Sequence, residues 1–413
     1  MDQETQVEII PGAVTRVTRY IHDELPLQFR NFLVTKKPWQ VKLFLILSFL
    51  IILGVTLISV EYTAEGYGYP TYSDIMNQLE NLRLMFPGNM IVTLTTVGYS
   101  VEEEPIKMFS ISNKNYVQHN SSCDNDNSLV MVVCGVHARE WTSPITCLHF
   151  IKQLQRIFND KDNDDDDYTL NILRQLRYKF IVVANPDGYK YTFMNSFVRS
   201  RRIHRKNRRS RHNGCVDGED GVDLNRNFPI GFNTNESYPT TGHSLDNPCS
   251  TIYRGPAPFS EPETRAIRDV MSGDVPWVSF SVHGNGNAWM TPYAYKPGVA
   301  DYDNIEVLRA VAAELNDNHD DGYPDYSVGA SSEMYSSTPG TLQDWVYVSL
   351  GVRRSFTVEM RDLCSKHDAG LSDFQDSVCE FQPDYHLAEK IIPPETWTGF
   401  KHLLKLCHER DCT

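Results

Sequence analysis

The chain has 413 residues, 41% of them hydrophobic, and a formal net charge of −14. This length accommodates one large domain with additional segments, and the negative balance argues against a nucleic-acid partner. There are 9 cysteines, an odd count, so at least one is unpaired or pairs with another chain. Together with sequons at Asn120 and Asn235, which predict glycosylation, they indicate the cell exterior or an organelle lumen.

An uncharged apolar segment at residues 43–60 is long enough to cross a bilayer. It begins too far from Met1 for an ordinary cleaved signal peptide, so we interpret it as a transmembrane signal-anchor, either retained or cleaved after insertion. Basic residues precede it, and Glu61 and Glu65 follow it, so the positive-inside rule predicts a single-pass type II membrane protein. Residues 1–42 would then be a cytoplasmic tail and residues 61–70 a stalk, with everything beyond extracellular or lumenal.

Beyond the stalk, predicted helices and strands alternate. Thr71 with Asp74 matches a capping box that opens a helix, and Ser260 with Glu263 matches a second one. Apolar stretches predict strands at residues 91–97, 106–111, 129–133, 180–184, 275–282 and 354–358. Helical spacing follows residue 141 and recurs at 305–315 and 396–407. This pattern is typical of an α/β domain, a mixed, largely parallel twisted sheet with helices on both faces, spanning residues 71–406 before a short tail at 407–413.

The stretch Gly135–Trp141 joins the predicted strand at 129–133 to the helix that follows it. His137 and Glu140 lie on this turn, where an imidazole nitrogen and a carboxylate oxygen can bind one zinc ion. The same spacing also fits a capping glutamate beside a surface histidine. Residues elsewhere in the chain are needed to distinguish a zinc site from a helix cap. Cys134 and Cys147, in the flanking strand and helix, are predicted to be free, buried thiols.

Two further residues, His283 and Glu359, end predicted strands. Because ligands of α/β sheets bind at the carboxyl ends of the strands, both are expected near His137. His283 could be the third ligand of a catalytic zinc, which keeps one position open. Glu359 could act as a general base and then as a proton donor.

Three arginines accompany these residues. Arg226 can bind a carboxylate through two parallel hydrogen bonds, and Arg205 can stabilise an oxyanion. Arg139 lies between the two ligands of the turn. The basic run at residues 199–211 contains Arg205 and is interpreted as an electropositive rim that steers a carboxylate-bearing substrate, with polyanion binding as the alternative.

From Tyr72 to Leu406 the chain resembles the zinc metallocarboxypeptidases related to pancreatic carboxypeptidases A and B. The resemblance rests on motifs in the order of that family: HAREW, HRKNR, DLNRNF, VHGNG, FTVEMRD and IIPPETW. It implies one Zn²⁺ per catalytic domain, held by His137, Glu140 and His283. It also implies that Glu359 activates water and that Arg205 polarises the carbonyl of the scissile bond.

The resemblance extends to the substrate. Asn225, Arg226 and Tyr335 would bind the C-terminal carboxylate of a peptide or protein, with Arg139 assisting. Cys215 and Cys249 match the disulfide of the family. The other cysteines with no assignable counterpart include Cys364, Cys379, Cys407 and Cys412.

Substrate preference in the family depends on the residue before an Asp-Trp pair. Here that residue is Gln343 or, with a gap placed later, Leu342, and neither is acidic. Ala294, Ala330 and Met334 align with small or apolar pocket walls. We therefore expect neutral, mainly apolar or aromatic C-terminal residues, with a basic or acidic preference as the alternative.

The chain departs from the family in two ways. The usual prodomain is not recognisable before the catalytic domain, so we expect an enzyme made active without zymogen control. Gly284 replaces a common serine or threonine after the third ligand, which should change only nearby substrate contacts.

The remaining alternative is a catalytically silent adhesion or receptor ectodomain on the same fold. The ectodomain is expected to be monomeric.

Overall fold

The computed structural model describes residues 68–114, 128–160, 167–194, 199–210, 215, 220–233, 244–318, 323–364 and 378–412. These belong to a compact unit, Tyr67–Thr413, that is distinct from Met1–Gly66. The cytoplasmic tail, the signal-anchor, most of the stalk and both sequons lie outside the described residues. Within the described ranges, no helix combines the length and the apolar character that a membrane span requires.

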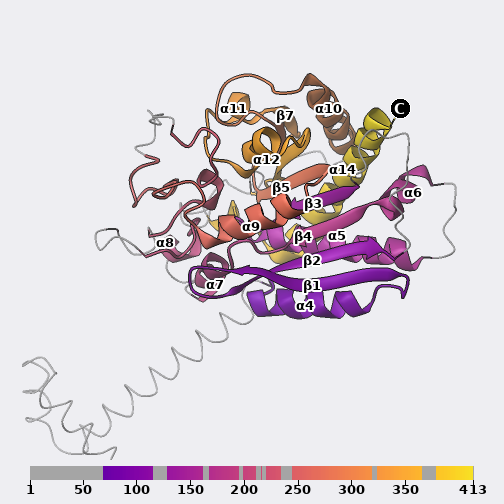
Figure 1. Cartoon of the computed structure of the whole chain (residues 1–413), viewed down its shortest axis with the longest axis horizontal. Coiled ribbons are helices and arrows are strands. Elements are labelled where there is room, and N and C mark those ends of the chain that lie inside the picture. The colour runs from indigo at the N-terminus through magenta and orange to yellow at the C-terminus, as the bar shows by residue number, and fades with distance from the viewer. Residues whose placement is uncertain are drawn as a thin grey trace, which may run out of the picture. The chain divides into compact units, whose positions relative to one another are not determined.

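An eight-stranded sheet runs through the unit in the order β1-β2-β4-β3-β5-β8-β6-β7 (Figure 1). The strands are β1 (Met90–Tyr99), β2 (Pro105–Asn113), β3 (Leu129–Val133), β4 (Arg177–Ile181), β5 (Val278–Gly284), β6 (Ala288–Thr291), β7 (Ser327–Ala330) and β8 (Arg354–Met360). The central strands β4, β3, β5 and β8 are parallel to their neighbours in this group. Antiparallel pairing joins β1 to β2, β2 to β4 and β6 to β8, while β6 and β7 are parallel. The predicted mixed, largely parallel sheet is confirmed.

Helices cover both faces of the sheet. They are α4 (Tyr72–Leu84), α5 (Thr142–Asn159), α6 (Tyr168–Gln175), α7 (Pro186–Met194), α8 (Arg199–Arg202), η1 (Leu224–Arg226), α9 (Pro262–Gly273), α10 (Tyr302–Asp317), α11 (Ser331–Met334), α12 (Leu342–Leu350) and α14 (Tyr385–Asp411). Alternate residues of β3 show the two layers. Val130 and Val132 pack in the larger core with α4, α5, α10 and α14, whereas Met131 and Val133 pack with α9 and α12.

The predicted elements are found with shifted boundaries. The capping box of Thr71 and Asp74 is present, but α9 begins at Pro262 after Glu261, with no side-chain cap. Glu263 accepts hydrogen bonds from Asn207 and Val101 instead, so the second predicted capping box was wrong. The last helix begins at Tyr385, well before residue 396, because it accommodates two internal prolines that look like a helix boundary in the sequence.

Disulfides correct one further prediction. Cys134 and Cys147 are bridged, with 6.5 Å between their Cα atoms, so the prediction that both are free thiols was wrong. Their burial in strand end and helix, which suggested free thiols, is also what brings them together. Cys215–Cys249 is bridged, as the resemblance implied, and so is Cys364–Cys379. Cys407, buried in α14, is the free cysteine of the described part of the chain.

Candidate metal centre and substrate cavity

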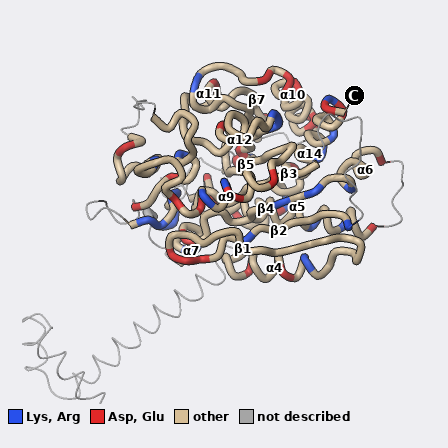
Figure 2. The backbone as a smooth tube through the Cα atoms, in the orientation of Figure 1, with Lys and Arg blue, Asp and Glu red and all other residues tan. Residues whose placement is uncertain are grey.

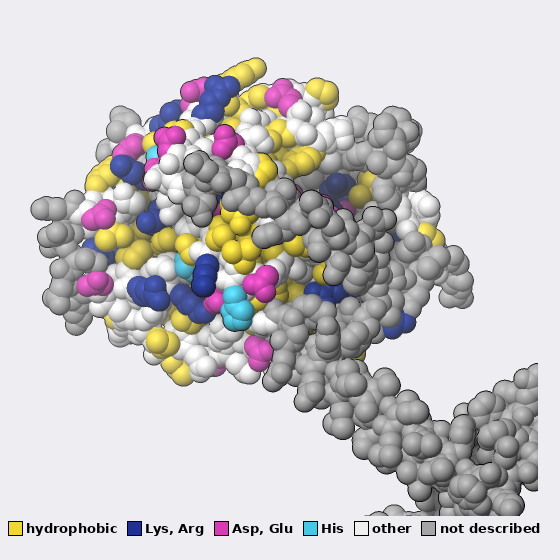
Figure 3. All heavy atoms as spheres, turned by 180° about the vertical axis from the view of Figure 1, so that it is seen from behind, with side chains coloured by type: hydrophobic (Ala, Val, Ile, Leu, Met, Phe, Trp, Pro, Cys, Tyr) yellow, Lys and Arg dark blue, Asp and Glu magenta, His cyan; other side chains and the backbone are white. Residues whose placement is uncertain are grey.

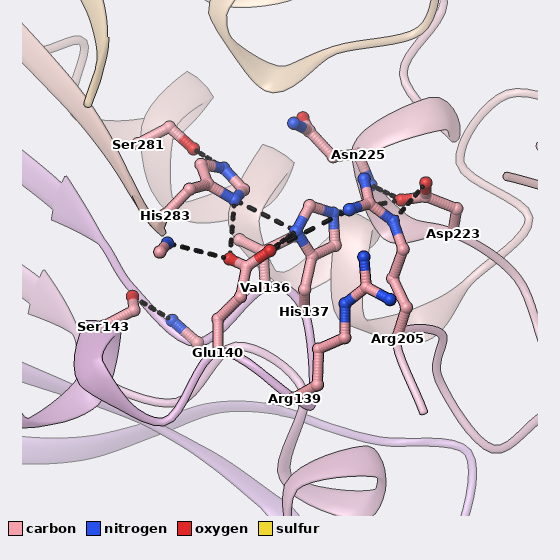
Figure 4. A network of polar contacts seen from close by, with 12 residues as sticks. Val136, His137, Arg139, Glu140, Ser143, Arg205, Asp223, Asn225, Ser281 and His283 are labelled. Atoms are coloured by element: carbon pink, nitrogen blue, oxygen red, sulfur yellow. Dashed lines mark hydrogen bonds and ion pairs between the residues drawn. The ribbon is translucent and has the colours of Figure 1, made fainter. Parts of the chain in front are cut away.

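Three ligand side chains converge at the carboxyl ends of β3 and β5 (Figure 4). Gly135 opens the turn after β3 with a φ of +61°, where a Cβ would stand 3.0 Å from the Val183 backbone. The turn aims His137 and Glu140 at His283, the penultimate residue of β5. His137 Nδ1 lies 2.7 Å from Glu140 Oε1, and His283 Nδ1 lies 3.1 Å from both His137 Nδ1 and Glu140 Oε2.

The chemistry of these donors fits a zinc ion. One ligand atom from each residue lies within 4.8 Å of the other two, and all three side chains are buried. Ligand atoms around a tetrahedral zinc at about 2.0–2.2 Å stand roughly 3.3–3.6 Å apart, somewhat farther than the 2.7–3.1 Å that separates these nitrogens and oxygens. Two histidines and one glutamate form the ligand set of a catalytic zinc site, with one position left open.

The outer nitrogens of both histidines are held by further residues. Ser281 Oγ lies 2.8 Å from His283 Nε2, and Asp223 Oδ1 lies 3.3 Å from His137 Nε2. Asp223 also accepts hydrogen bonds from Arg205 Nε and from the Asn225 backbone, both at 2.9 Å. Burial alone would raise the pKa of Asp223, but Arg205 and Arg226 outweigh it and hold that pKa well below its ordinary value.

Sequence reasoning did not identify Asp223 and Ser281. Both lie two residues from a residue that it did select, Asn225 and His283 respectively. The available signal was the rule that metal-binding histidines donate their second N–H to an oxygen acceptor. That rule names no position, so the partners had to be found in the structure.

Glu359 stands beside the metal centre, because β8 pairs with β5 and its register places Glu359 opposite His283. Desolvation raises the pKa of the Glu359 carboxyl to about 7, with Glu140 adding to the rise and His283 opposing it. A carboxylate with a pKa close to neutral can both accept and return a proton under physiological conditions.

A cavity of about 200 Å³ opens at this centre. Its lining includes the ligand His137 and the residues Arg205, Arg226 and Glu359, with Asn225, Asn285, Tyr335 and Thr338 beside them. The remaining lining residues, which we call the cavity floor, are uncharged and no more than 7% exposed: Met290, Ala294, Ser331, Thr341, Gln343 and Thr357. Arg226 is 8% exposed, and its Nε has no hydrogen-bond partner among the described residues. A buried cation of this kind is suited to an incoming carboxylate.

Some predicted pocket residues lie elsewhere. Leu342 packs in the core with Trp345, and only its backbone N–H reaches the site, donating to Asn225 Oδ1 at 3.0 Å. Ala330 and Met334 do not line the cavity. Arg139 is also outside the lining, and its guanidinium lies 3.8 Å over the Phe381 ring. Burial and the charge of Arg205 lower the pKa of Arg139 to about 10.

Gly284 has a local reason to be glycine. A Cβ at this position would stand 2.6 Å from Thr142 Oγ1 and 3.8 Å from Glu140 Cβ. A serine or threonine here would therefore require Thr142 to move. Glycine at position 284 thus leaves room for the Thr142 side chain of α5.

The described part of the basic run begins with α8, which Figure 1 labels, and several of its side chains are used within the fold. Figure 2 shows the Lys and Arg positions along the same backbone. Lys206 Nζ donates to the Pro248 and Ser250 carbonyls at 2.9 and 2.8 Å, and Arg209 pairs with buried Glu261. Arg208 lies 3.7 Å over the Tyr191 ring. In the described part of the run, Arg205 is the residue that lines the cavity, and the steering rim stays a prediction. On the face turned away from the viewer in Figures 1 and 2, Lys and Arg side chains are interspersed with Asp and Glu side chains (Figure 3).

Comparisons with known proteins agree with this site. The model of the family described as zinc carboxypeptidase matches residues 75–380. Mast cell carboxypeptidase A of Rattus norvegicus is 29% identical over 312 residues, which cover 73% of this chain and 66% of the relative. Carboxypeptidase B2 of Rattus norvegicus is 33% identical, with coverages of 64% and 57%. The match thus spans less than two thirds of the length of either relative.

Solved structures give the same result. Thrombin activatable fibrinolysis inhibitor matches with a TM-score of 0.63 and 26% identity, covering 81% of this chain and 73% of that one. Carboxypeptidase A from Helicoverpa armigera matches with a TM-score of 0.61 and 25% identity, with coverages of 83% and 74%. With the ligand set His137, Glu140 and His283 in place, the chain belongs to the zinc carboxypeptidase family.

Proposed function

We propose that this chain is a zinc-dependent exopeptidase that hydrolyses the C-terminal peptide bond of peptides and proteins. The observation that carries the proposal is one cavity lined by His137 of the ligand triad, by Glu359 and by Arg226, whose Nε has no hydrogen-bond partner among the described residues. A triad alone would fit many hydrolases. The nearby buried cation restricts the substrate to one that brings its own carboxylate, and a chain end does so.

In this proposal the substrate is positioned first. Arg226 and Asn225 bind the terminal carboxylate, and Tyr335, whose hydroxyl donates to the Gly286 carbonyl at 3.2 Å, lies at the exposed side of the cavity. Asn225 is held by the Leu342 N–H and Arg226 by its Nη1–H to the Asn225 carbonyl at 2.9 Å. Because these groups are fixed, the last peptide bond is placed beside Glu359.

Zn²⁺ bound by His137, Glu140 and His283 supplies Lewis acidity and lowers the pKa of water. Glu359 takes one proton from the attacking water and later delivers a proton to the nitrogen of the leaving residue. The carbon–nitrogen bond breaks, which yields a shortened peptide and a free amino acid. Arg205, held by Asp223 at 2.9 Å, stabilises the negative charge that develops on the carbonyl oxygen.

The proposed preference is for uncharged C-terminal residues, with the apolar and aromatic ones expected from the sequence. The cavity floor supports this, since none of its six residues carries a charge. Burying a lysine or glutamate side chain against it would leave the charge unpaired, which is unfavourable.

The rival proposal is a catalytically silent binding protein on the same fold. Such a protein would need neither a general base nor an arginine positioned to stabilise an oxyanion. Glu359 and Arg205 both line the cavity, which favours the enzyme.

We also propose that the catalytic unit is a monomer outside the cytoplasm, anchored by residues 43–60. Three disulfides among the described residues support an oxidising compartment. The anchor rests on the sequence alone. Protease protection of full-length protein in sealed vesicles tests it, because only the tail of residues 1–42 should be digested from the cytoplasmic side.

The function is tested by mass spectrometry of peptides that differ only at the C-terminus, incubated with the full-length protein. We expect loss of one residue from free C-termini that end in neutral residues, no cleavage of the matching C-terminal amides, and inhibition by a zinc chelator. Internal cleavage of the amidated peptides would contradict an exopeptidase. Release of lysine as fast as leucine would contradict the proposed preference.

A further inference from the structure

The floor of the substrate cavity contains a buried amide–hydroxyl pair. Gln343, the second residue of α12, donates from Nε2 to Ser331 Oγ at 3.1 Å, and Ser331 Oγ lies 3.3 Å from Gln343 Oε1. The two side chains are 2% and 6% exposed, and both line the cavity. Sequence reasoning left Gln343 and Leu342 as alternatives, and only Gln343 reaches the cavity.

The pair is held in place from behind. Ser355 Oγ donates to the Gln343 carbonyl at 2.9 Å, and the preceding Leu342 N–H donates to Asn225 Oδ1 at 3.0 Å. The floor is therefore linked to Asn225, a residue of the proposed carboxylate grip. A substrate held by its carboxylate would meet the amide at a fixed position.

The pair retains hydrogen-bonding capacity. A glutamine side chain has two N–H donors and two acceptor lone pairs, and the contacts to Ser331 use one of each. The floor offers no charge, since the neighbouring Asp344 carboxylate does not line the cavity and is occupied by the Ala294 and Tyr295 N–H groups at 3.0 and 2.8 Å. Its apolar members are Met290 and Ala294, while Ser331, Thr341, Gln343 and Thr357 are polar.

We propose that this cavity selects C-terminal residues whose uncharged side chain ends in a hydrogen-bonding group, such as tyrosine and glutamine, over their apolar counterparts phenylalanine and methionine. The inference rests on the proposed function and keeps its preference for neutral residues, but it ranks polar-tipped side chains above the apolar ones that the sequence led us to expect. A polar tip satisfies the spare amide donor or acceptor when the cavity is emptied of water, whereas an apolar tip leaves it unpaired. One neutral hydrogen bond corresponds to a preference of about tenfold.

The test compares matched peptides that end in Tyr or Phe, and in Gln or Met, with the full-length, zinc-loaded protein. We expect kcat/KM to be about tenfold higher for the polar member of each pair. Binding is measured separately by calorimetry with the Glu359→Gln variant, which should hold the peptides without cleaving them. There, too, Tyr-ending and Gln-ending peptides should bind about tenfold more tightly than their partners.

Two variants assign the preference to the pair. Gln343→Met keeps the approximate volume but removes both polar groups, and it should abolish or reverse the preference. Ser331→Ala should weaken it with less change to the floor, and it serves if Gln343→Met does not fold. The control is Gln155→Met on α5, a residue whose amide donates to the Met85 carbonyl far from the cavity, and it should leave both ratios unchanged.

The outcomes separate this inference from the function on which it rests. Equal or faster release of Phe and Met by the wild type would overturn the inference and leave the exopeptidase in place. A polar preference that survives in both Gln343→Met and Ser331→Ala would overturn the assignment to this pair. No release from any peptide would overturn the proposed function together with the inference.

Discussion

Asp223 connects the metal centre to Arg205, the arginine proposed to stabilise the oxyanion. Its carboxylate lies 3.3 Å from the ring of one ligand, His137, and accepts a hydrogen bond from Arg205 at 2.9 Å. It thereby fixes which nitrogen of His137 faces the metal and where the guanidinium points. The residue acts through its neighbours rather than on the substrate.

We predict that Asp223→Asn raises the zinc dissociation constant by about 10- to 100-fold, because an amide no longer favours the same ring orientation. Competition with a fluorescent zinc chelator measures it. Asp246→Asn is the matched control, since Asp246 is exposed and pairs with Arg254 away from the metal. Unchanged zinc affinity in Asp223→Asn would contradict the positioning role.

Gly286 shows how little space surrounds the proposed base. A Cβ there would overlap the Tyr335 hydroxyl and stand 2.7 Å from Glu359 Cβ. We predict that Gly286→Ala lowers kcat/KM by about 100-fold, because displacement of reacting groups by an ångström has effects of this size. Gly273→Ala is the control, since a Cβ at that position meets nothing within 4 Å. Equal activities of the two variants in peptide assays would contradict the packing argument.

Among the elements, β3 and α5 bear most directly on the metal centre, and a disulfide joins them. Cys134 follows β3, Cys147 lies in α5, and the loop between them contains both ligands of the turn. The bridge closes a loop with a sequence separation of 13 residues. Such a loop restricts the unfolded chain and holds the turn in the folded one.

We predict that the double variant Cys134→Ala/Cys147→Ala loses about 3 kcal/mol of the free energy of unfolding, from the loop-closure entropy of a loop of this size. Urea unfolding followed by fluorescence measures it. Cys407→Ala, which removes a buried thiol without a bridge, should lose less. A double variant as stable as the wild type would contradict a stabilising bridge.

The elements also show what a sequence can predict about a fold of this kind. β3 was predicted with its observed boundaries, because it is a run of five buried apolar residues that follows Ser128 and is soon ended by Gly135. Strands β6 and β7, each of 4 residues, and helices α11 and α12 were not predicted. They lie in a region rich in glycine and proline, where short elements are held by the sheet edge rather than by their own periodicity.

At the scale of the whole molecule, buried carboxyl groups join distant segments. Glu263 on α9 accepts hydrogen bonds from the Val101 N–H of the β1–β2 turn and from Asn207 of the loop before η1, both at 3.1 Å. Burial raises the pKa of Glu263 from 4.5 to about 7, although these hydrogen bonds oppose the rise. Between these two values the folded protein holds a proton on Glu263 that the unfolded chain has released.

The sign of the pH dependence follows. The contribution of protonated Glu263 to the free energy of unfolding is fully present below pH 4.5 and declines as the pH rises to about 7. Its upper limit is roughly 3 kcal/mol. We predict that Glu263→Gln, which cannot ionise, loses less stability than the wild type between pH 5 and about pH 7.5. Urea unfolding at both pH values measures it, with exposed Glu333→Gln as the control. An identical pH slope in Glu263→Gln would contradict the linkage.

The whole site was predictable only in part. Three site residues, His137, His283 and Glu359, were predicted to lie together because each stands at or just beyond the end of a strongly apolar strand, and parallel strands bring their carboxyl ends together. The complete ligand set, with Glu140, came from the family resemblance. Asp223, Ser281 and the Gln343–Ser331 pair depend on side-chain directions between segments that are far apart in the sequence. The disulfide between Cys134 and Cys147 was not predicted, because free thiols and disulfides are both commonly buried.

The most direct test of this account is titration of the metal-stripped, full-length protein with Zn²⁺ while release of the last residue from a peptide is followed. We predict that release rises to a plateau at one zinc per chain and that His283→Ala, which removes one ligand of the triad, gives no such plateau. Glu359→Gln should bind the zinc but release nothing measurable. Full activity of the metal-free protein, or a plateau unaffected by His283→Ala, would contradict the account.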